Sequence, residues 1–239
     1  MSLPDASSFQ ILETTVHTAE DGACLLDQHL ARMRDSARQL RQAYGEQQLF
    51  DCAAIDSAAA VRAQIGAQLG SDRTRHRIRM LLAHTGLLTV QVTPEPPLAS
   101  VPPLLVLDQQ PSQTDSVFVR CKTTHRPMYT TAAQRVAARH GDQAQVLLYN
   151  HDGLITEGNI ANVAVALPDA AGRLELVTPP LAAGLLPGTM RQRLLDTGRI
   201  REAPVTVAQF AQAVRSGWPV MCMNSVRGLY AVTPAIFSD

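Results

Sequence analysis

One lysine stands out among the residues that could carry chemistry. The chain has 21 lysines and arginines together, and Lys122 is the single lysine among them. Arginine replaces lysine well as a surface charge, but a guanidinium keeps its proton in a protein and cannot act as a nucleophilic amine. A mutational bias toward arginine would leave one lysine by chance, whereas a covalent site would require it. Lys122 is therefore the first candidate for covalent chemistry.

The surroundings of Lys122 fit such a role. It lies in the segment VRCKTTHR, residues 119–126, just ahead of a predicted helix. A lysine amine has a pKa of about 10.4 in water, and nearby cations such as Arg120 and Arg126 favour its neutral, nucleophilic form. The neighbouring Cys121 has no evident base, so we interpret it as a packing residue.

A carboxylate and a glycine-containing loop are the next candidates. Glu157 follows a predicted tight hairpin, and residues 184–191 (GLLPGTMR) lead into a predicted helix. The unpaired N–H groups and the dipole at a helix start suit a phosphate. Taken alone, a carboxylate such as Glu157 is more often a surface residue. A loop such as 184–191 more often marks only the start of a helix. The two gain weight because they occur in the same chain as Lys122.

Hydrophobic periodicity predicts the elements that hold these residues. In the first third, apolar steps of three and four predict a helix over 26–44. A second helix is expected over 56–69, capped by Asp56 or Ser57 and ended by Gly70. The runs 78–83 and 87–92 predict a β-hairpin.

The second half of the chain is expected to be richer in strands. Its predicted helices cover 128–139 and 189–195, and its predicted strands cover 104–107, 145–149, 154–156, 160–166, 174–177 and 220–224. Residues 93–103 contain five prolines and predict a linker between the halves. We therefore predict an α/β (α+β) fold with a small N-terminal domain at 1–95, a linker at 96–103 and a larger, strand-rich domain at 104–239.

Composition narrows the classes of partner. The 21 basic residues balance 21 acidic ones without long charged blocks, which argues against a nucleic-acid binder. The chain lacks an apolar run of the roughly 18 residues needed to cross a bilayer, and it shows no secretion signal at its start. Its four cysteines and seven histidines show no metal-site spacing. We expect a cytoplasmic protein with a small-molecule partner, no membrane association and no metal.

Five motifs in this order resemble the class IV aminotransferases, the fold-type IV enzymes of pyridoxal 5'-phosphate. The likeness spans nearly the whole chain. The matching stretches are HLARM at 29–33 with SA at 36–37, Lys122, EGNIANV at 157–163, LPGTMR at 186–191 and NSVRG at 224–228.

The resemblance implies a two-domain fold with the cofactor site between the domains, and a homodimer. It implies that Lys122 forms a Schiff base with the cofactor and then moves the proton at the substrate carbon. Glu157 would keep the pyridine nitrogen protonated, and Arg32 would hold the phosphate. The remaining cofactor-binding positions are Asn162, for which a structural role is favoured, and Gly188, Thr189, Met190 and Ser225.

The motifs do not by themselves select a reaction, because the family includes branched-chain and D-amino acid aminotransferases and 4-amino-4-deoxychorismate lyases. The segment KTTHRPMY at 122–129 resembles the lyases, and Met190 and Pro127 also depart from the aminotransferase pattern. Two features depart from the lyases as well. The likeness begins near Phe9 without the usual opening hairpin, and Thr130 replaces a common aspartate. A more open pocket or a different amine substrate would follow from these differences.

We therefore predict a lyase that converts 4-amino-4-deoxychorismate to 4-aminobenzoate and pyruvate, a step toward folate. The substrate carries two carboxylates, which Arg79, Arg126 or Arg227 would bind, with Tyr129 as a further substrate residue. One alternative is a class IV aminotransferase acting on branched-chain or D-amino acids. A second alternative is a cofactor-binding homologue without catalysis.

Overall fold

The computed structural model describes residues 3–97 and 100–236. It divides the chain into two compact units, unit 1 with Met1–Leu98 and Arg120–His125, and unit 2 with Ala99–Val119 and Arg126–Asp239. The segment that carries Lys122 therefore belongs to unit 1. Residues 98 and 99 of the predicted linker lie outside the described residues, as do 1–2 and 237–239 at the ends of the two predicted domains.

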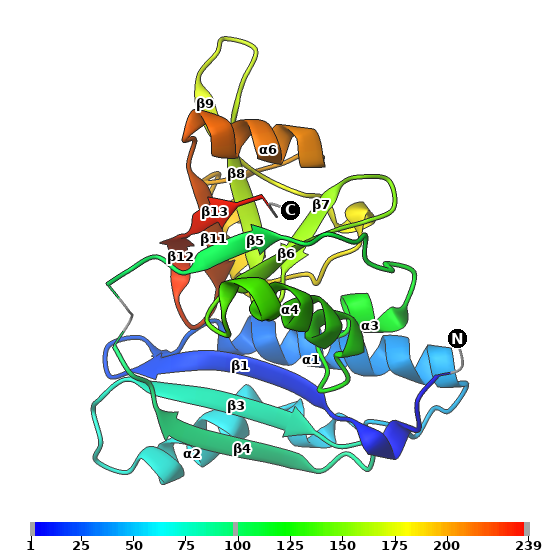
Figure 1. Cartoon of the computed structure of the whole chain (residues 1–239). Helices are drawn as coiled ribbons and strands as arrows, with labels where there is room; N and C mark the ends of the chain where they lie inside the picture. Colours follow the sequence, from blue (N-terminus) through cyan, green and yellow to red (C-terminus); the bar gives the residue numbers. More distant parts are fainter. Residues whose placement is uncertain (1–2, 98–99, 237–239) are drawn as a thin grey trace. The chain divides into compact units, whose positions relative to one another are not determined.

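Unit 1 is built on an antiparallel sheet with the strand order β2-β1-β3-β4 (Figure 1). The hairpin expected at 78–92 is confirmed, since Leu82 pairs with Leu88 at its closed end. β1 lies between β2 and β3, with Glu13 opposite Met80. The strands are β1 (Ile11–Thr18), β2 (Gly22–Ala23), β3 (His76–Leu82) and β4 (Leu88–Pro94).

Two helices cover one face of this sheet (Figure 1). α1 (Leu26–Tyr44) contacts β1, and α2 (Ala58–Leu69) contacts β4. Both helices were predicted, and the cap of α2 is Ser57, whose side chain accepts a hydrogen bond from the Ala60 N–H at 3.2 Å. The 3-10 helices η1 (Ala6–Ser8) and η2 (Ala53–Ile55) complete the unit.

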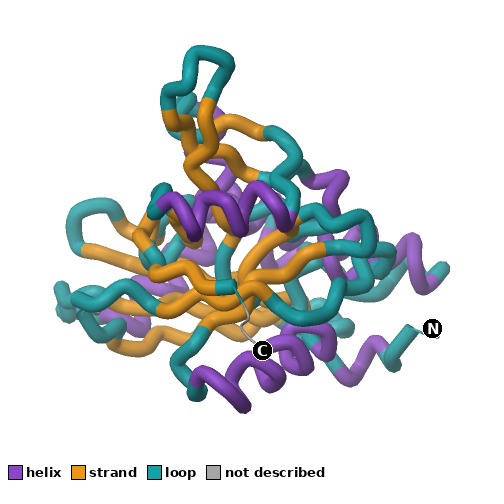
Figure 2. Tube along the Cα trace, turned by 45° about the horizontal axis from the view of Figure 1, so that its top comes forward, coloured by secondary structure: helices purple, strands orange, loops and turns teal. Residues whose placement is uncertain are grey.

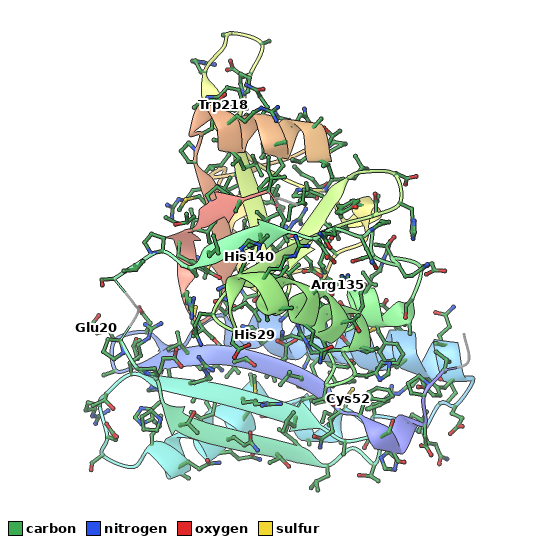
Figure 3. All side chains as sticks on the ribbon, viewed as in Figure 1. Glu20, His29, Cys52, Arg135, His140 and Trp218 are labelled. Carbon is green, nitrogen blue, oxygen red and sulfur yellow. The ribbon has the colours of Figure 1, made fainter. Side chains whose placement is uncertain are left out.

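Unit 2 contains two sheets. The first has the order β13-β5-β6-β7, and α4 (Pro127–His140) packs on it through Ala132 and Val136 (Figure 1). Asp108, which follows β5 and is buried, forms an ion pair with the half-buried Arg135 of α4, which is labelled in Figure 3. The strands of this sheet are β5 (Leu104–Leu107), β6 (Gln145–Tyr149), β7 (Ile155–Gly158) and β13 (Thr233–Ala235).

The second sheet of unit 2 has the order β10-β9-β8-β11-β12. The loop 169–173 joins β8 to β9 and extends beyond the sheet, at the top of the trace in Figure 2. Apolar side chains of both sheets and of α6 form one core. The elements are β8 (Asn162–Pro168), β9 (Leu174–Thr178), β10 (Arg201–Glu202), β11 (Val220–Asn224), β12 (Gly228–Ala231), η3 (Leu181–Ala183), α5 (Thr189–Asp196) and α6 (Val207–Ser216). α3 (Val117–Arg120) precedes the lysine segment.

The predicted helices at 128–139 and 189–195 and the predicted strands of the second half are all confirmed within a few residues. Helix α6 was missed, although its start carries a readable signal. Thr206 and Gln209 form a reciprocal capping box. Among the described residues, no helix combines the length and the apolar character needed to cross a bilayer.

The packing of α1 gives a first testable prediction. Leu40 is fully buried, whereas Leu87, in the turn between β3 and β4, is 67% exposed. Replacing Leu40→Ala leaves a cavity and should lower the free energy of unfolding by about 2–5 kcal/mol in urea titrations. Leu87→Ala is the matched control and should change it by less than about 0.5 kcal/mol. Equal losses in the two variants would contradict the assigned packing.

Candidate functional site

In unit 1, the segment 120–125 runs beside β1 and fixes the main chain at Lys122. The Leu12 N–H donates to the Lys122 carbonyl at 2.8 Å, and the Thr124 N–H donates to the Gln10 carbonyl at 2.9 Å. The hydroxyl of Thr124 accepts from the Gln10 N–H at 2.9 Å. Lys122 itself is half-buried. Its backbone is thus held on both sides, while its side chain retains contact with solvent.

The neighbouring Cys121 is part of the packing. Its thiol lies 3.7 Å from the Ser36 carbonyl on α1, one turn beyond Arg32. Burial raises the pKa of Cys121 to about 11, so the thiol stays protonated at neutral pH. This agrees with its interpretation as a packing residue. The contact also places the chain next to Lys122 beside the same helix that carries Arg32.

Arg32 forms a bidentate pair with Glu13, a residue that the sequence analysis missed. Arg32 Nε donates to Glu13 Oε1 at 2.8 Å, and Arg32 Nη2 donates to Glu13 Oε2 at 2.5 Å. His29 Nδ1 lies 2.6 Å from the same Oε2 (Figure 3). Glu13 has no exposed surface and lies on β1 between Ile11 and Thr15, on the face turned toward α1. An acidic residue at an inward position of a strand is the signal that could have marked Glu13 as a candidate, although it does not identify its partner.

Glu13 is ionised at neutral pH. Burial by itself would raise its pKa, but the charges of Arg32 and His29 and their hydrogen bonds outweigh burial and lower the pKa from 4.5 to about 2. Arg79 does not join this group. It lies next to Met80, the cross-strand partner of Glu13, so its side chain points to the opposite face of the sheet and is exposed.

In unit 2, a second buried carboxylate is surrounded by donors. Glu157 is 4% exposed. Its Oε1 accepts hydrogen bonds from the Tyr129 hydroxyl at 2.7 Å and from the Leu186 N–H at 3.0 Å. Its Oε2 accepts from Asn162 Nδ2 at 3.1 Å, and the same amide nitrogen donates to the Leu186 carbonyl at 3.0 Å. The structure thus brings together Glu157, Asn162 and Tyr129, three of the residues predicted for the site.

Tyr129 and Arg126 were predicted as substrate residues, and in the structure both are linked to Glu157. The Arg126 guanidinium lies over the Tyr129 ring, 4.5 Å from its centroid, and donates to the Asn159 carbonyl. Burial, the Glu157 charge and the hydrogen bond to Glu157 raise the pKa of Tyr129 well above 10.0. The hydroxyl therefore remains a donor to Glu157 throughout the physiological pH range.

The loop before α5 approaches this group closely. A Cβ at Gly188 would lie 1.8 Å from Asn162 Oδ1, so the position has room only for glycine. Thr189, the first residue of α5, places its hydroxyl 2.7 Å from the Ser225 hydroxyl, and both residues are buried. Met190 directs its side chain to the apolar cluster around Leu194. The start of α5 therefore offers two adjacent hydroxyls together with backbone N–H groups.

Arg191 and Asn224, which were not predicted, support this arrangement. Arg191 is 2% exposed, forms an ion pair with Glu202 and donates to the Pro179 carbonyl at 2.7 Å, which anchors the first turn of α5. Asn224 Oδ1 accepts from the backbone N–H groups of Val226 and Arg227 at 3.0 and 2.9 Å, which shapes the turn that carries Ser225. Arg227 itself lies over the Tyr230 ring.

The chemistry of these groups fits pyridoxal phosphate. A buried carboxylate held in place by hydrogen bonds, such as Glu157, suits a protonated ring nitrogen. Paired hydroxyls at a helix start, as at Thr189 and Ser225, suit a phosphate. A lysine amine is the group that attaches this cofactor. Among the described residues, no group of three or more histidine, cysteine, aspartate or glutamate side chains could hold a metal ion.

The ionisation of Glu13 predicts an acid-sensitive contribution to stability. Because its folded pKa is depressed, this contribution is complete above the unfolded pKa of 4.5 and is lost as the pH falls toward about 2. In urea titrations, the difference in unfolding free energy between the native chain and Glu13→Gln should shrink by about 3 kcal/mol between pH 6 and 2. A difference that stays constant over this range would contradict an ionised Glu13.

The close approach of Gly188 to Asn162 predicts that a larger residue at this position destabilises the fold. Gly188→Ala must displace Asn162, which bonds to Glu157, and should lower the free energy of unfolding by about 1–3 kcal/mol. Gly66 in α2 has no atom within 4 Å of its added Cβ, so Gly66→Ala should be neutral or stabilising. Thermal unfolding of both variants checks this, and a neutral Gly188→Ala would show that Asn162 can move without cost.

A family profile, a protein sequence and a solved structure are each similar to nearly the whole of this chain. The Amino-transferase class IV family profile matches residues 11–234. A Schizosaccharomyces pombe protein with the provisional name aminodeoxychorismate lyase is 34% identical over 219 residues, which cover 91% of this chain and 86% of that protein. A crystal structure of a Mesorhizobium loti protein, provisionally described as an amino-acid aminotransferase, has a TM-score of 0.76 and 31% identity, and the match covers 95% of this chain and 99% of that one.

A partial match is also found with the mitochondrial branched-chain-amino-acid aminotransferase of Mus musculus. It is 38% identical over 94 residues, which cover 37% of this chain and 24% of that protein. The profile match and the nearly full-length S. pombe relative agree with the motifs that led to the resemblance. The chain belongs to the amino-transferase class IV family.

Proposed function

We propose that the chain is a pyridoxal-phosphate-dependent lyase that converts 4-amino-4-deoxychorismate to 4-aminobenzoate and pyruvate. The observation that carries the choice of reaction is the similarity to the S. pombe protein along 91% of this chain. The segment at 122–129 supports the same choice, because it resembles the lyases rather than the branched-chain aminotransferases. The buried carboxylate of Glu157, with its three donors, supports the choice of cofactor.

In this proposal each candidate residue has one task. Lys122 attaches the cofactor, and Glu157 faces the ring nitrogen in the orientation that Tyr129 and Asn162 impose. The phosphate is held by Arg32, by the Thr189 and Ser225 hydroxyls, and by the backbone at Gly188, Thr189 and Met190. Bound in this way, pyridoxal phosphate supplies an electron-accepting ring.

The reaction then needs one residue that moves a proton. The Lys122 amine, which the substrate amine would displace from the cofactor, would take the proton from the ring carbon that bears the substrate amino group. The bond from the neighbouring ring carbon to the enolpyruvyl oxygen breaks, and the departing group takes up a proton to become pyruvate. Because the remaining ring becomes aromatic, the step is irreversible. Arg126 and Arg227 are the candidates for the two substrate carboxylates, and Arg126 is favoured by its contact with Tyr129. Arg79, the third predicted residue, is left out because its side chain points to the face of the sheet opposite Glu13.

An aminotransferase is the second candidate, favoured by the match to the M. loti protein, which covers nearly all of both chains. The two reactions differ in what they consume. The lyase forms 4-aminobenzoate from one substrate, whereas an aminotransferase requires a keto acid as amino-group acceptor. A cofactor-binding homologue without catalysis would bind pyridoxal phosphate and release neither product.

We further propose that the enzyme acts in the cytoplasm as a homodimer on a small-molecule amine. Family membership supports the dimer, and the balanced charge supports a small-molecule partner. Light scattering coupled to gel filtration tests the dimer directly. A monomer at micromolar concentration that still turns over substrate would remove this part of the proposal.

The central prediction concerns Lys122. Native protein with pyridoxal phosphate should show a visible absorbance band and, after borohydride reduction, a covalent adduct on the peptide that contains Lys122. Lys122→Ala and Lys122→Arg should both lose the adduct, because arginine keeps the charge without a nucleophilic amine. Added 4-amino-4-deoxychorismate should then yield 4-aminobenzoate, without a keto acid, in the native chain alone.

The outcomes separate the candidate functions. A product that forms only with a keto acid would favour the aminotransferase. An adduct without turnover of any amine would favour the non-catalytic homologue. An adduct that persists in both Lys122 variants would remove the lysine assignment.

A further inference from the structure

Glu13 is a charged residue at a position where an apolar side chain would fit. It is fully buried, and its neighbours on the face turned toward α1 include Ile11 and Met80, which have no exposed surface. Replacing a buried ion pair by apolar residues is often neutral or stabilising, so stability alone is a weak reason for a pair here. The geometry of the pair suggests a more specific reason.

The carboxylate holds one edge of the Arg32 guanidinium. Both of its oxygens are engaged, at 2.8 Å from Nε and 2.5 Å from Nη2. A guanidinium is planar, so fixing the Nε–Nη2 edge also fixes the direction of its opposite edge, which carries the Nη1 donors. His29 Nδ1, 2.6 Å from Oε2, restricts rotation of the carboxylate. The three side chains thus form a rigid group between β1 and α1.

We propose that Glu13 is a positioning residue that orients Arg32 toward the cofactor phosphate. This inference rests on the proposed function, in which Arg32 binds that phosphate. Arg32 can make a bidentate contact with a phosphate only if its plane is fixed, and Glu13 and His29 supply this constraint from the protein side.

Charge and orientation make opposite predictions for the removal of Glu13. The negative charge of Glu13 offsets the positive charge of Arg32, so neutralising Glu13 should strengthen phosphate binding if charge alone decides. If orientation decides, the same change should weaken binding, because the guanidinium loses a partner that accepts two charge-assisted hydrogen bonds. The sign of the effect therefore distinguishes the two accounts.

The test compares pyridoxal phosphate with pyridoxal, which lacks the phosphate. Dissociation constants of both compounds are measured by absorbance titration of the native chain and of Glu13→Gln. The native chain should prefer pyridoxal phosphate, and this preference should fall about tenfold in Glu13→Gln, while the affinity for pyridoxal changes little. A purely structural role would weaken binding of both compounds alike.

A matched control is available in the same unit. Glu95 is also buried and accepts two hydrogen bonds from one guanidinium, at 2.7 and 3.0 Å from Nε and Nη2 of Arg77. Glu95→Gln should keep the preference for pyridoxal phosphate within about twofold. If Glu13→Gln does not fold, Glu13→Asp replaces it. This variant keeps the charge but is one methylene shorter, so its preference should also fall.

The outcomes are distinct. An unchanged or increased preference in the folded Glu13 variant would overturn the positioning role and leave the proposed function intact. If the native chain binds both compounds equally, no phosphate contact exists for Glu13 to support. That result would overturn the positioning role together with the phosphate contacts assigned in the proposed function, while the Lys122 adduct would still test the reaction. A native chain that binds neither compound would overturn the proposed function and the positioning role together.

Discussion

A buried carboxylate is tolerated only where donors replace the water it has lost, and in each unit of this protein one such group lies among the residues of the candidate site. In unit 1 the group is Glu13, which draws Arg32 and His29 of α1 onto β1. In unit 2 it is Glu157, which gathers the Tyr129 hydroxyl, the Asn162 amide and the Leu186 N–H. A strand and a helix meet at Glu13, and two strands, a helix and a loop meet at Glu157, so these hydrogen bonds fix several elements at once.

The two carboxylates are satisfied in different ways. Glu13 is paired with two side chains of a single helix, Arg32 and His29 of α1. Glu157 accepts hydrogen bonds from a tyrosine hydroxyl, a side-chain amide and a main-chain N–H, which come from three different elements. In the proposed function, Glu13 has a supporting role and Glu157 has the direct cofactor contact.

The regular elements could be predicted because their signals are local. The stripe of α1, the Ser57 cap and the β3–β4 hairpin each depend on residues close in sequence. The pairing of Glu13 with Arg32 could not be predicted, because it depends on the register of a strand against a helix 19 positions away. The contact of Tyr129 with Glu157 joins residues 28 positions apart, and no periodicity reports such a separation. The motifs predicted the residues of the candidate site, and the fold determined which of them touch.

The segment that carries Lys122 is separated in sequence from the rest of unit 1. The chain enters unit 1 at Arg120 and leaves it after His125, and in between it hydrogen bonds to Gln10 and Leu12. A fragment that ends in the proline-rich stretch would therefore lack the Lys122 amine. It would also lack the segment that hydrogen-bonds to Gln10 and Leu12 at the start of β1. A single crossover between two related genes cannot exchange the two units, because unit 1 is made of two separate stretches of the chain. Recombination would have to transfer residues 120–125 together with the first part of unit 1 from the same gene, which favours inheritance of the chain as a whole.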